Sequence, residues 1–325
     1  MAGTSASDMW AVGSYFPDHS VIEHWDGTAW QLVGHPDPPS GGLVAVAAIS
    51  PNDAWAIGNS SKLLAEHWDG AAWTLFPIPL PPSYAFYLYG ISAVSTDDVW
   101  MVGDYTGQGG IHPLAEHWDG ARWTLVPAPD GSDFGTNGFY DVSAGATDDV
   151  WAVGYQDVTG GADFQPLVEH WDGMEWSVVQ TPPLPGLNNQ LFGVSAVSVT
   201  NAWAVGLFEP SVTEPLVEHW DGMAWSLESV PRHPGKANEF NSASATSGTD
   251  AWAVGVVYSQ RNDYRPRADH WDGSQWKTSV VPYPGTDAIF LGTAMLSSSD
   301  VWAVGATVGD QGETPLIEHY TDPCQ

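Results

Sequence analysis

The residues with the clearest potential for chemistry form a repeated cluster. The stretch EHWDGTAW, residues 23–30, returns as EHWDGAAW, EHWDGARW, EHWDGMEW, EHWDGMAW and DHWDGSQW. A carboxylate beside a histidine can transfer protons, and a histidine with two acids can ligate a metal. Side chains alternate along a strand, however, so Glu and Trp share one face while His and Asp share the other. We therefore expect a structural motif, in which Trp packs between repeats, His and the acids satisfy buried backbone and turn groups, and Asp caps a tight turn.

These clusters belong to an internal repeat of 45 to 52 residues. Each unit carries a landmark tryptophan followed three positions later by glycine; the landmarks are Trp10, Trp55, Trp100, Trp151, Trp203, Trp252 and Trp302. In the third unit, residues 89–95, 99–103, 114–118 and 123–126 read as four short strands, and Asp119-Gly120 closes the last hairpin. Such units are typical of a β-propeller. We predict an all-β, seven-bladed β-propeller with four-stranded antiparallel blades, forming a single domain over residues 1–325.

The first and last units are incomplete. MAGTSAS is only the tail of a first strand, and the final unit ends in EHYTDPCQ, without the Asp-Gly turn and the fourth strand. We expect a three-stranded last blade and adjacent termini.

The repeat resembles bacterial Trp-rich propellers of the kelch and galactose-oxidase-like kind. DVWAVG stands where a kelch repeat has an aromatic strand ending in Gly-Gly, and EHWDGxxW stands where kelch has an aromatic-Asp turn followed by Trp. The resemblance covers nearly the whole chain and implies the propeller fold. The chain has a single Gly at that position and lacks the copper ligands and modified cysteine of galactose oxidase, because its one cysteine is Cys324. The oxidase chemistry is therefore not carried over.

Composition restricts the partners. The chain has 39 Asp plus Glu against 8 Lys plus Arg, so phosphate backbones and anionic lipids would repel it. It contains no apolar run near 18 residues, and we expect a soluble monomer without nucleic-acid or membrane partners. One cysteine allows no intrachain disulfide. No signal peptide follows Met1, which predicts a cytoplasmic protein, or an extracellular one if a signal peptide has been removed.

The connections predict which end of the ring carries function. The turns between first and second strands, and between third and fourth strands, are short and stereotyped, whereas the other connections are long and differ in every unit. Binding residues concentrate on irregular loops of a rigid scaffold. We place the site on the long-loop face, at the mouth of the central channel.

Two carboxylates are the candidate catalytic groups. Ten residues before each landmark Trp the sequence has Ala, Gly, Ser or, once, Asp141. A carboxylate at the channel-facing end of an inner strand needs a partner or a function, and its pKa is expected to rise; a hydrogen bond that staples a loop is the alternative. Asp104, just after the glycine of its second strand, is the second candidate.

Aromatic and polar residues on the same side are the candidate ligand contacts, because sugar rings and other flat amphipathic ligands bind such surfaces. Loop packing is the alternative. The candidates are Tyr15, Tyr89, Tyr105, Tyr140, Tyr155, Phe192, Phe208, Asn241, Tyr258, Arg261 and Arg265. The arginines belong to a basic group that could clamp a carboxylate or phosphate, with a solvated charge patch as the alternative. That group is Arg232, His233, Lys236, Arg261, Arg265 and Arg267.

Metal and cofactor signals are weak. The off-pattern histidines His19, His35, His112 and His233 have no metal-binding spacing. The acidic loops at residues 130–133, 157–163 and 309–313 could supply oxygens to calcium, but none is an EF-hand. We expect no resident cofactor.

Three functions remain open. The leading hypothesis is a lectin-like recognition propeller that binds a glycan or another polar-aromatic small ligand. The second is an enzyme, a lyase, hydrolase or cyclase, that uses acid and base groups at the channel mouth. The third is a protein-interaction scaffold. Mouth residues that differ between blades favour one central, asymmetric site.

Overall fold

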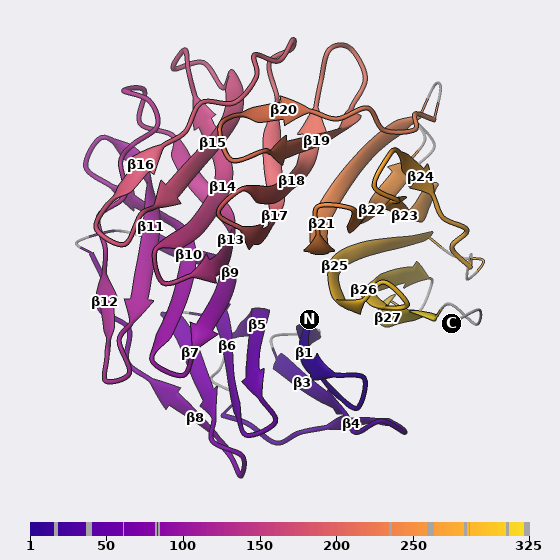
Figure 1. Cartoon of the computed structure of the whole chain (residues 1–325). Coiled ribbons are helices and arrows are strands. Elements are labelled where there is room, and N and C mark those ends of the chain that lie inside the picture. The colour runs from indigo at the N-terminus through magenta and orange to yellow at the C-terminus, as the bar shows by residue number, and fades with distance from the viewer. Residues whose placement is uncertain are drawn as a thin grey trace.

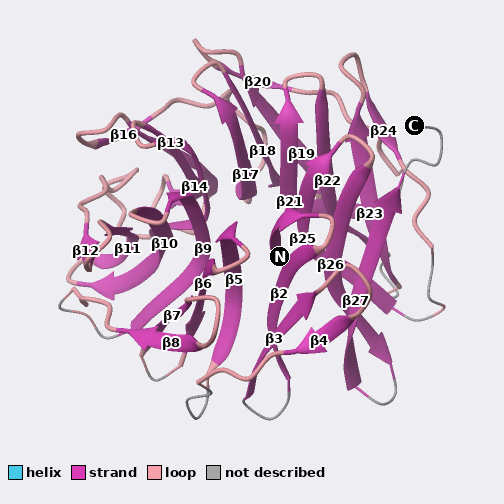
Figure 2. Cartoon of the chain, turned by 60° about the horizontal axis from the view of Figure 1, so that its bottom comes forward, coloured by secondary structure: helices cyan, strands magenta, loops and turns pink. Residues whose placement is uncertain are grey.

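The chain forms seven antiparallel sheets arranged around a common axis (Figure 1). The computed structural model describes residues 1–15, 19–36, 41–60, 62–81, 83, 85–233, 236–258, 263–282, 285, 287–309 and 312–321. Every regular element in these residues is a strand, as Figure 2 shows. The described part accordingly has no helix that could span a membrane. The predicted seven-bladed all-β propeller is confirmed.

Each of the first six blades has four strands in chain order, and the first strand is the innermost. Blades 1 and 2 consist of β1 (Ala2–Ser5), β2 (Asp8–Tyr15), β3 (His19–Trp25), β4 (Trp30–Leu32), β5 (Gly42–Ser50), β6 (Asp53–Asn59), β7 (Leu63–Trp68) and β8 (Trp73–Phe76). Blades 3 and 4 consist of β9 (Ala85–Ser95), β10 (Asp98–Gly107), β11 (Gly110–Trp118), β12 (Trp123–Leu125), β13 (Asn137–Ala146), β14 (Asp149–Asp157), β15 (Phe164–Trp171) and β16 (Trp176–Val178).

Blades 5 and 6 consist of β17 (Gln190–Ser198), β18 (Asn201–Phe208), β19 (Glu214–Trp220), β20 (Trp225–Leu227), β21 (Ala237–Ser247), β22 (Asp250–Tyr258), β23 (Tyr264–Trp271) and β24 (Trp276–Thr278). Blade 7 has only β25 (Asp287–Ser297), β26 (Asp300–Gly309) and β27 (Gly312–Thr321), which confirms the three-stranded last blade. The N-terminus lies near the axis (Figure 1), whereas β27, the last described strand, is the outermost strand of blade 7.

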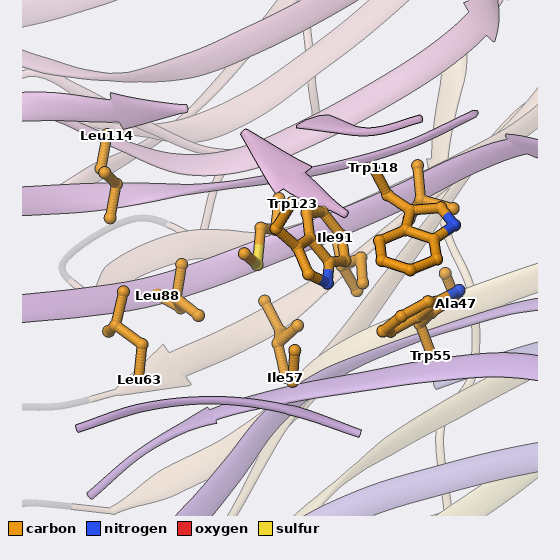
Figure 3. Close-up of a cluster of buried hydrophobic side chains, with 12 residues drawn as sticks. Ala47, Trp55, Ile57, Leu63, Leu88, Ile91, Leu114, Trp118 and Trp123 are labelled. Atoms are coloured by element: carbon orange, nitrogen blue, oxygen red, sulfur yellow. The ribbon is translucent and has the colours of Figure 1, made fainter. Parts of the chain in front are cut away.

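Tryptophan side chains hold neighbouring blades together. The landmark Trp of a second strand lies between two hairpin aromatics of the next blade. The ring centroid of Trp55, for example, lies 4.9 Å from that of Trp118 and 5.1 Å from that of Trp123. Trp252 is the exception, since it contacts Tyr320 of the three-stranded blade 7. Figure 3 shows the Trp55 contact together with Ile57 and Leu88. The ring closes in the same way, because Trp302 of blade 7 lies 5.5 Å from Trp25 of blade 1. Closure therefore rests on the same aromatic packing as the other interfaces.

The repeated EHWDG cluster is structural, but one expectation about it is wrong. The Asp of its turn accepts backbone hydrogen bonds, as Asp119 does from Ala121 and Arg122 at 2.9 Å each. The histidine, predicted to satisfy backbone groups, instead binds a side chain: His117 Nε2 lies 2.8 Å from Asp98 Oδ1 and its ring stacks on Trp100. The partner Asp stands two positions before the landmark Trp, on the neighbouring strand, so the pair links the two strands.

The glutamates of the cluster also depart from the expectation. Glu116, Glu169 and Glu218 are fully buried, and neither carboxylate oxygen has a hydrogen-bond partner among the described residues. Burial raises their pKa values to about 8, 9 and 8. They are therefore protonated at neutral pH and fill space in the interfaces rather than supply charge.

Candidate functional site

A cavity of about 1540 Å³ occupies the axis of the ring. Six residues stand at equivalent positions of the inner strands, eleven before the landmark Trp, and all line this cavity. We call them the collar: Val44, Tyr89, Tyr140, Phe192, Asn241 and Leu291. They lie in the first halves of strands that begin at the long-loop end of each blade. The structure thus brings together four of the predicted contacts, Tyr89, Tyr140, Phe192 and Asn241.

The aromatic members of the collar form a continuous arc over blades 3 to 5. Tyr140 is at its centre. Its ring centroid lies 5.4 Å from that of Tyr89 and 5.3 Å from that of Phe192, and both pairs pack edge-to-face. The Tyr140 hydroxyl donates to Gln190 Oε1 at 3.1 Å. Edge-to-face packing fixes these rings while leaving part of each accessible, since all three are half-buried. The other half of the collar is aliphatic or amide.

Asp104 lies behind the arc and anchors it. Its carboxylate is buried, and the hydroxyls of Tyr155, at 3.4 Å, and of Tyr89 hydrogen-bond to it. Burial raises the pKa of Asp104 to about 6, against the opposing effect of these two hydrogen bonds. Burial and the Asp104 charge in turn raise the pKa of Tyr140 to about 12 and those of Tyr89 and Tyr155 further. All three hydroxyls are therefore protonated hydrogen-bond donors at neutral pH.

Asp141 lines the cavity next to Tyr140. Its Oδ2 accepts a hydrogen bond from the backbone amide of Val194, in the next inner strand, at 2.9 Å. Burial raises its pKa to about 7, although the amides of Val194 and Val142 and the Met1 amino group favour the charged form. Ser242 makes the equivalent bond to Thr293, so Asp141 takes part in a pattern that ties inner strands together. The raised pKa agrees with the expectation, whereas the hydrogen bond joins two inner strands rather than stapling a loop.

The remaining aromatic candidates do not line this cavity. Tyr155 lies directly behind the collar, 5.1 Å from Tyr140. Tyr105 stacks beside His112, Phe208 packs in the interface of blades 4 and 5, and Tyr258 stacks on Tyr264. The reason is geometric: the second strand lies behind the first, so residues past its glycine reach the axis only where the first strand leaves room. The side chain of Tyr15 lies outside the described residues.

The basic residues do not converge into an anion clamp. Arg267 is buried and is held by Asp269, at 2.7 Å, and by Asn238. Arg232 pairs with Glu214 at 2.8 Å, and Arg265 is an exposed partner of Asp263. Arg261 lies outside the described residues. Over the portion of the chain that the structure describes, no Lys or Arg lines the axial cavity.

Two of the off-pattern histidines, His35 and His112, and the acidic loop at residues 157–163 are engaged locally. His35 lies 3.1 Å from the buried Glu66, and His112 pairs with Asp130 at 2.9 Å. Asp157 caps its own loop by accepting hydrogen bonds from Thr159, Gly160 and Ala162. The described residues contain no group of three or more His, Cys, Asp and Glu placed to hold a metal ion.

Sequence reasoning missed Gln190 and the role of Asp104 as an anchor. Gln190 stands two positions before Phe192, and strand alternation could have placed it on the same face. Asp104 contacts Tyr155 and Tyr89, which stand 51 and 15 positions away on other strands, and no local sequence pattern predicts these contacts.

No protein-family model matches this sequence, and no curated protein matches it. Solved structures are similar in fold. YCF48 from Cyanidioschyzon merolae is 12% identical over 97% of this chain and 96% of that chain, with a TM-score of 0.57. A structure of YCF48 bound to D1 peptide is 14% identical over 87% of this chain and 78% of that chain, with a TM-score of 0.55. SapL1 lectin in complex with alpha methyl fucoside is 12% identical over 88% of this chain and 97% of that chain, with a TM-score of 0.49. At these identities the two YCF48 structures support the propeller fold and nothing finer.

Proposed function

We propose that this propeller is a recognition module that binds one small ligand on the collar, and that the ligand presents a ring face and hydrogen-bonding groups, as a glycan does. The observation that supports this most is the aromatic arc of Tyr89, Tyr140 and Phe192 around one side of the axial cavity. Aromatic faces flanked by fixed polar groups suit sugars and other flat amphipathic molecules.

The polar groups of the cavity restrict the ligand class further. Asp141 stands beside the arc, and Asn241 and Ser242 of blade 6 line the same cavity. The hydroxyl protons of Tyr89 and Tyr140 are donated to Asp104 and Gln190, so their oxygens can accept hydrogen bonds from a ligand, as can Asp141 once its proton is lost. With carboxylates and no Lys or Arg among the described lining residues, the ligand is neutral or cationic, because an anion would be repelled.

The collar also suggests a single ligand. The six collar residues all differ in type except for one pair of tyrosines, so the aromatic surface covers only part of the ring. A multivalent lectin would repeat its binding residues in every blade. One ligand seated off-centre, against blades 3 to 5, fits this asymmetry.

Acid and base catalysis is the second candidate. It is favoured by two carboxylates, Asp104 and Asp141, whose pKa values burial raises to about 6 and about 7, into the range where a group can both give and take protons. Only Asp141 lines the cavity.

A glycan array and a set of neutral and cationic aromatic metabolites, screened against the wild-type protein, test the proposal. We expect the affinity of any ligand found to fall about tenfold or more in Tyr140→Ala, because a stacking surface is lost. Tyr258→Ala is the matched control, since this half-buried tyrosine stacks on Tyr264 outside the cavity. Equal affinity of wild type and Tyr140→Ala would overturn the collar as the site.

The same ligands decide between recognition and catalysis. If a ligand is turned over by the wild type and not by Asp141→Asn, the enzyme hypothesis replaces the recognition hypothesis. If none binds at millimolar concentration, both ligand-based functions fail and a protein-interaction scaffold remains.

A further inference from the structure

The three residues of the aromatic arc stand at β-bulges of their inner strands. The ladder between β13 and β14 skips Tyr140, and the corresponding ladders of blades 3 and 5 skip Tyr89 and Phe192. A bulge interrupts the alternation of side chains along a strand. Tyr140 and Asp141 would point to opposite faces of a regular strand, but here both line the axial cavity. The bulge therefore places a carboxylate beside an aromatic ring on the same wall.

The rings of the arc are inclined to one another and do not form a flat platform. The plane of Tyr140 makes an angle of 67° with that of Tyr89 and of 66° with that of Phe192. A sugar ring stacks on one flat face, whereas inclined rings partly surround a compact, rounded group. Several aromatic rings around one point form the kind of cage that binds quaternary ammonium groups, because the face of each ring is electron-rich.

Asp104, behind the arc, makes this surface more attractive to a cation. The Tyr89 hydroxyl donates to the buried Asp104 carboxylate, and the Tyr140 hydroxyl donates to Gln190 Oε1 at 3.1 Å. A phenol that donates a hydrogen bond to a carboxylate gains electron density, so its ring face attracts a cation more strongly. Asp104 thus favours a positively charged ligand without touching it.

Asp141 supplies a carboxylate inside the cavity, and its neighbours leave room for it. An added Cβ at Gly90, on the inner strand of blade 3, would lie 2.8 Å from Asp141 Oδ1, so only a glycine fits there. On the other side, the Val194 amide of blade 5 donates to Asp141 Oδ2 at 2.9 Å. The carboxylate is therefore held in position between two blades and next to the ring of Tyr140.

The other charges of the cavity also favour a cation. Glu23 and Glu313 line it together with Asp141, and no Lys or Arg does so within the described ranges. His35 is engaged with a buried glutamate at 3.1 Å, and burial lowers the pKa of the Met1 amino group to about 6, so this group carries little charge at neutral pH. The net charge of the chain, −31, attracts cations further.

We propose that the ligand of the collar is an organic cation, whose N-alkylated ammonium group lies against Tyr89, Tyr140 and Phe192 and pairs with the carboxylate of Asp141. This inference rests on the function proposed above and names the ligand class of the same site. A primary ammonium needs acceptors for three N–H groups, whereas aromatic rings cover the methyl groups of an alkylated one. The rest of the ligand extends into the cavity, whose volume of about 1540 Å³ far exceeds that of the ammonium group.

Choline is the probe, and dimethylbutanol, its neutral tert-butyl analogue with carbon in place of the charged nitrogen, is the matched control. Isothermal titration calorimetry at about 0.15 M sodium chloride measures both, because salt screens the non-specific attraction of cations to an acidic chain. We expect saturable one-to-one binding of choline with a Kd of about 1 mM or lower. The neutral analogue should bind at least about tenfold more weakly. Equal affinity of the two probes, or no saturable binding of choline, would overturn the proposal.

Two pairs of variants test the ring and the carboxylate separately. Tyr140→Leu keeps an apolar side chain but loses the ring and should weaken choline binding about fivefold or more, whereas Tyr140→Phe should stay within about threefold of the wild type. Asp141→Asn keeps an acceptor for the Val194 amide but loses the charge and should weaken binding about tenfold. Asp97→Asn, at an exposed turn of the short-turn end, removes the same charge and should leave the affinity unchanged. Wild-type affinity in Tyr140→Leu or in Asp141→Asn would overturn the proposal.

The results also separate this inference from the function proposed above. If a neutral sugar binds and loses affinity in Tyr140→Ala while choline does not bind, the collar remains the site and its ligand is not a cation. If choline binds equally well to the wild type and to Tyr140→Ala, the cation lies elsewhere and the proposal fails.

Discussion

The short-turn end and the long-loop end of this propeller differ in how uniform their residues are from blade to blade. At the short-turn end most blades repeat one set of contacts, which blade 3 illustrates: its landmark Trp100 lies between two hairpin aromatics of the next blade, and it has a His–Asp pair and an Asp-capped turn. At the long-loop end the corresponding positions carry Val, Tyr, Phe, Asn and Leu. Chemistry-bearing residues are therefore densest where they are structural, and the asymmetric end holds fewer but better placed polar groups. Four tests follow, the largest expected effect first.

Removal of a landmark tryptophan should be the most damaging change. Trp100 is buried, with ring centroids 4.9 Å from Trp171 and 5.2 Å from Trp176. Trp100→Ala leaves a cavity at a blade interface and should lower the free energy of unfolding by about 3–5 kcal/mol, measured by urea denaturation. Tyr140→Ala, at the half-buried collar, should cost less than half as much. Equal losses would contradict a structural short-turn end and a functional long-loop end.

Two glycines at equivalent positions differ in how closely other atoms surround them. An added Cβ at Gly103 would lie 1.8 Å from the Tyr87 carbonyl oxygen, so Gly103→Ala should destabilise the fold by about 1–3 kcal/mol through overpacking. An added Cβ at Gly13 makes only an ordinary van der Waals contact, 3.7 Å from Val21 Cγ1, so Gly13→Ala should change stability by less than about 0.5 kcal/mol. Urea denaturation of both variants gives the comparison. A large loss in Gly13→Ala would contradict the difference in crowding between the two glycines.

The buried glutamates predict a dependence of stability on pH. Their pKa values in the folded state, about 8 for Glu116 and Glu218 and about 9 for Glu169, lie above the unfolded value of 4.5. The folded state therefore binds more protons than the unfolded state between these values, and the free energy of unfolding falls as pH rises from about 5 to about 9.

Glu169→Gln isolates this effect, because an amide cannot ionise. The variant should be more stable than the wild type at pH 9, on the order of 1 kcal/mol or more, and the two should converge near pH 5. Melting temperatures across this range provide the measurement. A wild type whose stability rises steadily to pH 9 would show that these carboxyls are charged in the fold.

The smallest effect concerns blade 5, in which the histidine of the cluster has Asn instead of Asp at its partner position. Asn201 stands where the other blades have Asp, and burial lowers the pKa of His219. Asn201→Asp should raise that pKa and stabilise the fold by about 0.5–1.5 kcal/mol. A raised folded pKa adds stability below the unfolded value of about 6.5 and loses it as pH rises, so the gain should be larger at pH 5 than at pH 8. NMR titration of His219 measures the shift, and an unchanged pKa would refute the pairing rule.

The sequence was sufficient for the fold because each blade needs the same Trp contacts, and their spacing is visible in the chain. It also placed Tyr89, Tyr140 and Phe192 on one wall, since strand alternation fixes which residues of an inner strand face the axis. It misplaced Tyr105, Phe208 and Tyr258, because the depth of a second strand behind the first depends on strand length. It could not show that the Arg267–Asp269 pair is buried, because the burial of two residues on one strand depends on what packs over that strand.

Amide hydrogen exchange with and without the ligand from the screen tests the central claim most directly. The account predicts slower exchange in the first halves of β9, β13 and β17, around residues 86–90, 138–142 and 190–194, and no change in the six WDG hairpins. Slower exchange in the hairpins, with the inner strands unaffected, would contradict this account. It would indicate that the repeated EHWDG cluster binds the ligand.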